Sequence, residues 1–414
     1  MANMVFVGDP KTNLPVKDTI TDVKTLNSAL KVVSTITLGD FKQLVQKDAL
    51  VFNEVVGGTA TSVYENAHGG VKMTVNASGD YVVRESRIVF NYTAGNPQVV
   101  ELTAIDLTPV VNVIKRVGYG SRTTVAPHAT GIDGFCFETD NTDLWVKVYK
   151  GGSVLYEARQ DKWDDPMLTT SGRSGLILDK SKFQAMVIDF LYLGGTCVRF
   201  GFIIGETVNW VHTFKNSNIG ASTFVLSPNQ PVFWDIRSSG AAVASLYHIC
   251  CRVASLGDIN NIGYVRHHNN AAAFTNANTV GTKYALIGVQ QTNRNYVTEV
   301  VSFSAMALTA DKYLVELIVN PTVAGVFTYN AVANSGYSIA LGDSVGNPST
   351  NTVTGGIVID GGYASSGQDM AEHTSNFLRI GRTIAGVYDT IVVVVTPLTV
   401  NLDILGGVEV RELI

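Results

Sequence analysis

The stretch that decides the fold is Ser171–Gly205, which reads SGRSGLILDKSKFQAMVIDFLYLGGTCVRFGFIIG. Its two runs FQAMVIDFLYL and CVRFGFIIG are rich in β-branched and aromatic residues, and the pair Gly194-Gly195 between them favours a tight turn. A polar loop with several glycines precedes the first run, and no helical periodicity occurs nearby. The stretch therefore predicts two consecutive buried strands, which are typical of the inner layer of a β-sandwich.

Charged residues are scarce in this chain. They make up 16% of the 414 residues, whereas hydrophobic residues make up 46%. Soluble domains usually carry about a quarter of charged residues. We therefore expect part of the surface to be buried against other subunits in a homo-oligomer or larger assembly. The alternative is an ordinary β-rich protein whose surface is covered by Thr, Ser and Asn.

The charge pattern and the apolar runs exclude several classes of protein. The net charge is −5 and there is no Lys/Arg run, which argues against nucleic-acid binding. The longest apolar run, 391–395, is too short to insert into a bilayer. The N-terminal sequence MANMVFVGDPKTNLP lacks the pattern of a secretory leader, so we expect synthesis in the cytoplasm. The four cysteines are too few and too irregular for a disulfide framework.

The strand pattern suggests two units. Residues 1–112 are predicted to form an N-terminal arm and a small β-rich docking domain, with a short helical segment at Asp22–Val32. Residues 113–414 contain many short strand patterns separated by Gly, Asn or Pro, and they predict an antiparallel jelly-roll β-sandwich. Within this second unit, LWVKVYKGGSVLYEA predicts a hairpin with Gly151-Gly152 in its turn.

Several blocks of this second unit resemble a recurring sequence pattern. They are SGRSG, LDKSKFQAMVIDFLYLGGTCVRFGFIIG, HTFKNSN and PNQPVFWDI, followed by LVELIVNPTVAGVFTYN, NTVTGGIVIDGGYASSG and FLRIGRTIAGVYDTIVVVVTPLTVNLDILGGVEVREL. Together they resemble an uncharacterised virion structural protein family of tailed bacteriophages and some large DNA viruses, with a concanavalin-like jelly-roll pattern. The resemblance covers roughly residues 130–414. It implies a structural role in a virion and carries over no catalytic residue.

Four residues of one charged loop are candidate contacts for a partner subunit or a glycan. They are Asp161, Trp163, Asp164 and Asp165, in the sequence RQDKWDD. A tryptophan among charges is expected to be exposed, and exposed aromatic residues are common at binding surfaces. Trp145 and Trp234, by contrast, lie in apolar strand patterns and are expected to pack in the core.

Carboxylates near this loop raise two other hypotheses. Asp140 and Asp143, like the Asp161 group, could bind Ca²⁺, although neither matches the spacing of a calcium loop and Asp is a common turn former. Glu138, Asp140, Asp143 and Glu157 lie on neighbouring predicted strands, with Asp189 further along, and a glycosidase requires such a carboxylate pair. The four tryptophans, Trp210 among them, could then form a sugar platform.

We expect neither catalysis nor a cofactor or resident metal. The sequence contains no phosphate-binding glycine loop, no GxSxG elbow and no HExxH pattern. The function expected first is that of a phage virion structural protein, an oligomeric tail, collar or head-surface (fibre or decoration) component that binds copies of itself and other virion proteins. The alternative is a lectin-like receptor-binding protein that recognises host surface glycans.

Overall fold

The residues that the structure describes fold mainly into strands. The computed structural model describes residues 35–43, 45–122, 132–191, 195–257, 263–271, 274–293, 296–309, 311–343, 348–365, 370–399 and 401–413, with the backbone alone for 122 and 370–378. Within these ranges the regular elements are strands in antiparallel pairs and one 3-10 turn, η2 (Gln160–Lys162). The predicted all-β class is confirmed, and the helical segment predicted at 22–32 lies outside the described residues. No helix in the described ranges has the length and apolar composition needed to span a membrane.

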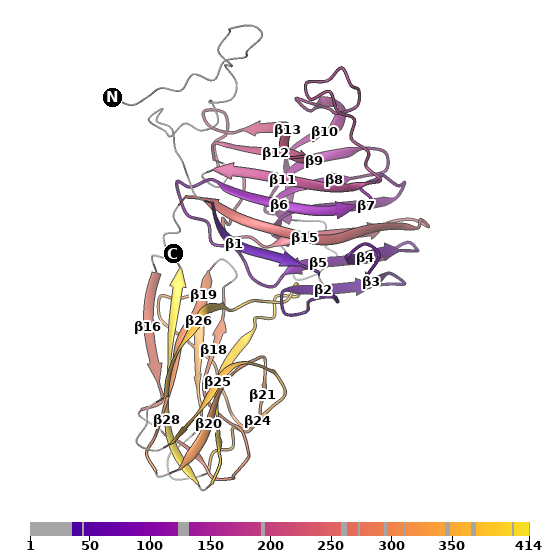
Figure 1. Ribbon diagram of the computed structural model, residues 1–414. Coiled ribbons are helices and arrows are strands. Elements are labelled where there is room, and N and C mark those ends of the chain that lie inside the picture. Colours follow the sequence, from indigo (N-terminus) through magenta and orange to yellow (C-terminus); the bar gives the residue numbers. More distant parts are fainter. Residues whose placement is uncertain are drawn as a thin grey trace, which may run out of the picture.

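The N-terminal sandwich consists of two sheets (Figure 1). Sheet I has the order β13-β12-β11-β6-β15-β4-β3, with β1 also paired to β15. Its strands are β1 (Thr35–Lys42), β3 (Thr61–Glu65), β4 (Gly70–Val75), β6 (Gln98–Ile105), β11 (Phe183–Leu191), β12 (Cys197–Ile204), β13 (Thr207–Lys215) and β15 (Ala244–Leu256). Sheet II has the order β10-β9-β8-β7-β14-β5-β2. Its strands are β2 (Phe52–Gly57), β5 (Tyr81–Ser86), β7 (Val113–Arg122), β8 (Ile132–Thr139), β9 (Leu144–Lys150), β10 (Ser153–Arg159) and β14 (Val232–Ser238).

The C-terminal sandwich, residues 263–413, also has two main sheets. Sheet III has the order β16-β28-β19-β26, with β17 on β28, and sheet IV has the order β22-β23-β18-β27-β20-β25. The strands of sheet III are β16 (Gly263–Asn269), β17 (Thr275–Ala277), β19 (Val297–Ala307), β26 (Met370–Arg379) and β28 (Leu402–Leu413). Those of sheet IV are β18 (Tyr284–Gln291), β20 (Lys312–Val319), β22 (Asn330–Ala331), β23 (Tyr337–Leu341), β25 (Ile357–Ser365) and β27 (Thr390–Pro397). A separate pair joins β21 (Thr322–Val323) to β24 (Val353–Thr354).

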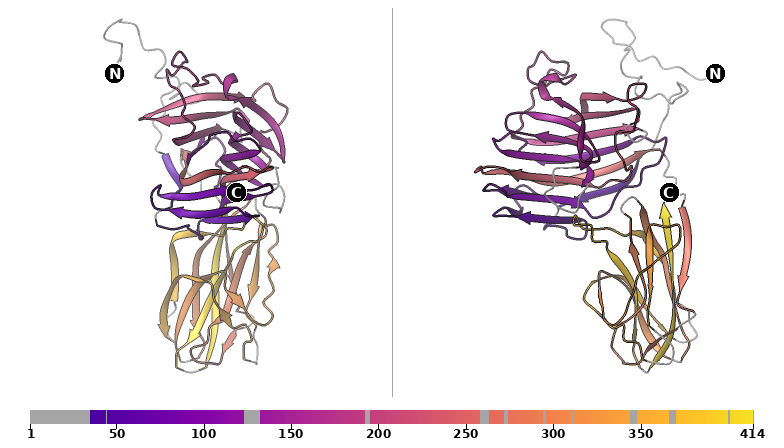
Figure 2. Two further views of the ribbon diagram at one scale, coloured as in Figure 1. Left: turned by 90° about the vertical axis from the view of Figure 1, so that its right-hand side faces the viewer. Right: turned by 180° about the vertical axis from the view of Figure 1, so that it is seen from behind.

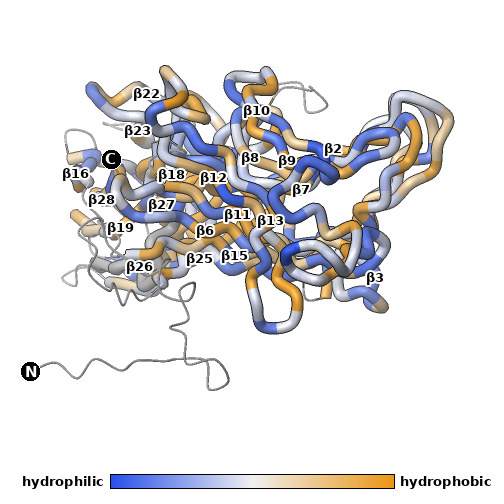
Figure 3. Tube along the Cα trace, turned by 90° about the horizontal axis from the view of Figure 1, so that it is seen from above, coloured by the Kyte–Doolittle hydropathy of each residue, from blue (hydrophilic) through white to orange (hydrophobic). Residues whose placement is uncertain are grey.

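The strand pair predicted from 171–205 lies inside sheet I, between β13 and β6. Strands β11 and β12 are antiparallel, with Ile188 opposite Phe200. Both of these side chains are fully buried in the core between sheets I and II, as is Trp234 from β14. Hydrophobic and hydrophilic positions both occur along the strands of the molecule (Figure 3), and successive side chains of a strand point to opposite faces, so that one face can be buried. The prediction of two consecutive buried strands is therefore confirmed.

The sheets do not divide at the predicted boundary between residues 112 and 113. Strand β14 pairs with β5 on one side and β7 on the other, and β6 lies between β11 and β15. Strands from before and after residue 112 therefore share both sheets of one sandwich, and the break between sheets falls between β15 and β16. The spacing of strand patterns could not reveal this, because pairing across more than 100 residues leaves no local signal.

Polar and apolar contacts join the two sandwiches, whose strands run in different directions in Figures 1 and 2. The Arg87 guanidinium forms an ion pair with Asp389, and its Nε donates to Oδ2 at 3.1 Å. Arg382 Nη2 donates to Glu85 Oε1 at 3.1 Å. Beside these pairs lies a small apolar cluster of Val89, Val297 and Leu413. The junction therefore has the buried polar pairs and the apolar contact of a specific interface.

Candidate binding site

Trp163 is buried, which corrects the prediction that it is exposed. Only 4% of its surface is accessible, its Nε1 donates to the carbonyl of Ala158 at 2.9 Å, and its ring lies 6.3 Å from that of Phe202. The turn η2 directs its own charged side chains outward, and the chain then turns Trp163 into the sandwich. The charged residues around Trp163 therefore indicate that its neighbours are exposed, but they do not indicate whether the tryptophan itself is exposed.

The three aspartates of the same loop have separate surroundings. Asp165 is buried and accepts from the Ser174 N–H at 2.8 Å, so it fixes the loop. Asp161 is exposed, and the hydrogen-bonded guanidinium of Arg159 lowers its pKa to about 2. Asp164 is also exposed and accepts from the Thr213 N–H at 3.1 Å. The four predicted residues therefore do not form one common surface.

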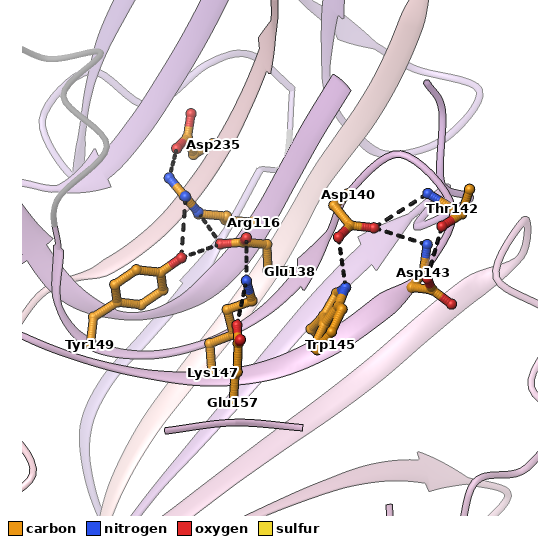
Figure 4. A network of polar contacts seen from close by, with 10 residues as sticks. All are labelled: Arg116, Glu138, Asp140, Thr142, Asp143, Trp145, Lys147, Tyr149, Glu157 and Asp235. Carbon is orange, nitrogen blue, oxygen red and sulfur yellow. Dashed lines mark hydrogen bonds and ion pairs between the residues drawn. The ribbon is translucent and has the colours of Figure 1, made fainter. Parts of the chain in front are cut away.

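A network of charged side chains occupies the outer face of sheet II, the face turned away from the core (Figure 4). Arg116 on β7 forms ion pairs with Glu138 on β8 and, at 3.3 Å, with Asp235 on β14. Tyr149 on β9 donates its hydroxyl to Glu138 Oε2 at 2.7 Å. These residues alternate with core residues along their strands, so the strand register brings them onto one face.

Lys147 carries this network toward solvent. Its Nζ lies 3.1 Å from Glu138 Oε1 and 3.0 Å from Glu157 Oε2, on β8 and β10 respectively. The side chain of Lys147 is 11% exposed and that of Glu157 is 45% exposed. The exposure of the side chains on the outer face thus increases from Arg116, which is buried, to Glu157, which is accessible at the margin of the sheet. The predicted hairpin of β9 and β10 is confirmed, and it builds this margin.

The electrostatics of the network favour the ionised forms of Glu138 and Arg116. Burial by itself raises the pKa of Glu138, but the cations Arg116 and Lys147 outweigh it, and the net pKa is lowered. Burial likewise lowers the pKa of Arg116, and the carboxylates of Glu138 and Asp235 reverse this and raise it. A carboxylate between two cations in a buried setting is held in one geometry, because leaving either charge unpaired there is costly.

Trp145 lies at the accessible end of this face. Its Nε1 donates to Asp140 Oδ2 at 2.9 Å, while Asp140 Oδ1 accepts from the Asp143 N–H at 3.0 Å. The Lys147 Nζ is 5.0 Å from the centre of the indole ring, and Arg159 is the partner of Trp145 across the β9–β10 hairpin. A half-buried indole is therefore held in one orientation among carboxylates and cations (Figure 4).

The structure brings together part of the predicted carboxylate set. Glu138, Asp140, Asp143 and Glu157 lie around Trp145, on or beside three adjacent strands. Asp189 does not join them, because it lies on β11 in sheet I and forms an ion pair with Arg199. Of the tryptophans expected in the core, Trp234 is fully buried, whereas Trp145 is only half-buried and faces outward.

Four members of the site were not predicted from the sequence. They are Arg116, Lys147, Tyr149 and Asp235. The alternation of Trp145, Lys147 and Tyr149 with core valines along β9 is a signal that could have indicated a polar outer face. In the described ranges, no group of three or more His, Cys, Asp or Glu side chains has the arrangement of a metal site.

Comparisons with known proteins assign no family to the chain. No family model matches the chain, and no curated protein matches it. Among solved structures, a β-glucanase of Bacillus licheniformis is similar, with 11% identity over 53% of this chain and 99% of that chain, at a TM-score of 0.34.

Two lectin-like structures are similar to the same degree. A legume lectin-like domain from Entamoeba histolytica shares 11% identity over 53% of this chain and 98% of its own, at a TM-score of 0.32. Peanut lectin shares 8% identity over 54% and 97%, also at 0.32. Likenesses with TM-scores this low establish neither a superfamily nor a ligand nor an activity for this chain.

Proposed function

We propose that this protein binds carbohydrate on the outer face of strands β8, β9 and β10, around Trp145. The observation that carries the proposal is the half-buried indole of Trp145, held by Asp140 and flanked on the hairpin by the accessible side chains of Glu157 and Arg159. The distant likenesses in fold add nothing to this argument, which rests on the side chains alone.

The chemistry of the face suits a sugar ring. One side of a pyranose is apolar and stacks on an aromatic ring, while its hydroxyl groups need acceptors and donors around the rim. Trp145 supplies the ring, Glu157 and Asp143 supply acceptors, and Arg159 supplies donors. Because the indole is fixed by its bond to Asp140, little side-chain entropy is lost when a ligand stacks on it.

We further infer that the site binds without catalysis. Glycoside hydrolysis needs one carboxyl group that still carries a proton, and hence a raised pKa, beside a second that is ionised. Arg116 and Lys147 lower the pKa of Glu138, which makes it a poor proton donor. Its Oε2 is also occupied by the Tyr149 hydroxyl.

A glycan array tests the proposal. We expect the wild type to bind a defined set of glycans, and Trp145→Ala to lose about tenfold or more in affinity for them, because the stacking surface is removed. Trp210→Ala is the matched control, since Trp210 is also half-buried but lies on β13 in sheet I, where it stacks on Arg199 at 4.2 Å. Equal loss in both variants, or no glycan bound by the wild type, would contradict the proposal.

A second candidate function is the structural role in a virion that the sequence resemblance implies, with assembly through copies of the chain. It is favoured by apolar side chains exposed on an edge strand of the C-terminal sandwich. On β16, Tyr264 and Val265 are 63% and 52% exposed, although they point to opposite faces. Exposed edge strands with such side chains pair readily with other chains. Light scattering after size exclusion should then give an oligomer, whereas a monomer at micromolar concentration would argue against this role.

A further inference from the structure

We infer a site of spontaneous covalent modification, far from the Trp145 face in sequence and on the other sandwich: the pair Asp360-Gly361 on β25, where the aspartate is converted to isoaspartate. An aspartate followed by glycine is especially prone to this reaction, because glycine has no Cβ to hinder the approach of its own nitrogen to the preceding carboxyl group. The sequence contains two such pairs, Asp133-Gly134 and Asp360-Gly361. Their surroundings in the fold decide which of them reacts.

The carboxylate of Asp360 already lies against the nitrogen with which it would react. The Gly361 N–H donates to Asp360 Oδ1 at 2.8 Å. The carboxyl carbon of Asp360 is therefore held close to the Gly361 nitrogen, and intramolecular reactions are fast when the reacting atoms are kept in near contact.

The strand around this pair is loosely held. Strand β25 is the last strand of sheet IV, and in the part of the chain that the structure describes it pairs on one side only, with β20. The register with β20 shifts just before Asp360, so that Ile359 stands opposite no residue of β20. Gly361, which follows, is exposed. A bulge beside a glycine on an edge strand lets the main chain leave strand geometry at little cost, as closure of a ring requires.

The pair Asp133-Gly134 has the opposite surroundings. It lies on β8, which pairs with β7 on one side and with β9 on the other. Asp133 is 1% exposed, and its carboxylate accepts from the N–H groups of Gly151 at 3.0 Å and Ser227 at 3.1 Å and from Gln230 Nε2 at 3.0 Å. These bonds fix the carboxylate, so a reaction at Asp133 must wait until the sandwich opens.

The reaction needs no reactant besides water. The Gly361 nitrogen forms a bond to Cγ of the protonated Asp360 carboxyl group, and the amide proton leaves with the carboxyl hydroxyl as one molecule of water. This step closes a five-membered succinimide ring. Water then adds to the main-chain carbonyl carbon of Asp360 and breaks the bond from that carbon to the ring nitrogen. The main chain now runs through Cβ and Cγ, the former carbonyl carbon carries the free carboxylate, and the mass is unchanged.

The product lengthens the main chain of β25 by one carbon atom. Beyond Asp360, Gly361 lies opposite Glu316 and Tyr363 lies opposite Leu314 on β20. An extra main-chain atom disturbs the matching of N–H and C=O groups on which this pairing depends. Because β20 also pairs with β27, we expect the core of the sandwich to persist while its edge strand loosens.

Peptide mapping by mass spectrometry tests this inference, with electron-transfer fragmentation to distinguish isoaspartate from aspartate. Folded protein and protein unfolded in urea are incubated side by side for several weeks. We expect Asp360 to isomerise in the folded protein within about tenfold of its rate in urea, whereas folding should slow Asp133 by at least about a hundredfold, because only Asp133 requires the sandwich to open. Equal protection of the two pairs by folding, or no isoaspartate at Asp360 in the folded protein, would overturn the inference.

Two substitutions at the same position test the chemistry. Asp360→Asn should react several-fold faster through the same ring, which the mass gain of deamidation reports. Asp360→Glu keeps the carboxylate but would have to close a six-membered ring, so it should give no detectable product. Thermal unfolding of both variants before incubation checks that they fold as the wild type does. Reaction of Asp360→Glu at the wild-type rate would overturn the succinimide route.

Discussion

The rings of Trp234 and His248 stack with their centroids 3.6 Å apart and their planes 15° from parallel. Trp234 belongs to β14 in sheet II and His248 to β15 in sheet I, so the stack links the two layers of the N-terminal sandwich. Both residues are fully buried. The imidazole Nδ1 accepts a hydrogen bond from Arg84 Nε at 3.2 Å. His248 must therefore be neutral in the folded protein.

The first prediction concerns acid. Burial, together with the positive charge of Arg84, holds the pKa of His248 well below its usual value of 6.5. Below about pH 6.5 the imidazole is therefore protonated in the unfolded chain but stays neutral in the folded chain. The free energy of unfolding then decreases as the pH falls, by at most about 1.4 kcal/mol per pH unit. Urea unfolding at pH 7.5 and 5.0 measures this loss.

His248→Phe separates this contribution from those of other groups, such as His212, whose pKa burial also lowers. The variant should be less stable at pH 7.5 but should lose less stability than the wild type on acidification. A variant with the same pH dependence as the wild type would show that His248 does not titrate in this way.

The second prediction concerns the buried network beneath the binding site. Arg116→Met removes a cation that is 3% exposed and leaves Glu138 and Asp235 without it. Breaking one side of a buried ion pair costs about 3–5 kcal/mol, because the remaining charge stays desolvated. Denaturant unfolding should show a loss of this order. Lys162→Met, at an exposed cation whose side chain is 73% accessible, is the control and should change little. Similar losses of unfolding free energy in the two variants would contradict the claim that the buried network stabilises the fold.

The third prediction concerns the junction of the sandwiches. Arg87→Ala removes the ion pair with Asp389 that lies between them. We expect calorimetry to resolve the unfolding of the two sandwiches into separate transitions, since less free energy then couples them. Lys42→Ala removes an exposed pair with Asp40 and should leave the profile unchanged. If Arg87→Ala unfolds with the same profile as the wild type, the apolar contacts alone are enough to couple the unfolding of the two sandwiches.

The sequence allowed local features of this fold to be predicted. The strands β11 and β12 follow from runs of β-branched and aromatic residues, and the hairpin of β9 and β10 follows from alternation around a short glycine turn. All of these signals lie within a few residues of one another. The place of β14 between β5 and β7 could not be predicted, because it depends on pairing between distant segments. The sharing of one sandwich by residues on both sides of 112 follows from that pairing.

The prediction of the site was wrong about the burial of individual tryptophans. Trp163 has charged neighbours and is buried, while Trp145 has apolar neighbours and faces outward. In a strand, orientation is set by the parity of the position and not by the average polarity of the stretch. Val146 and Val148 face the core, so Trp145 and Lys147 must face the other way. Alternation along the strand shows which residues share a face, but it does not show which of the two faces packs against the core.

The most direct test of the central claim is a crystal structure of the protein with the glycan that it binds most strongly on an array. We predict a sugar ring in van der Waals contact with the indole of Trp145, with hydroxyl groups bonded to Glu157, Asp143 or Arg159. A glycan bound elsewhere, with the outer face of β8–β10 empty, would contradict carbohydrate binding at Trp145.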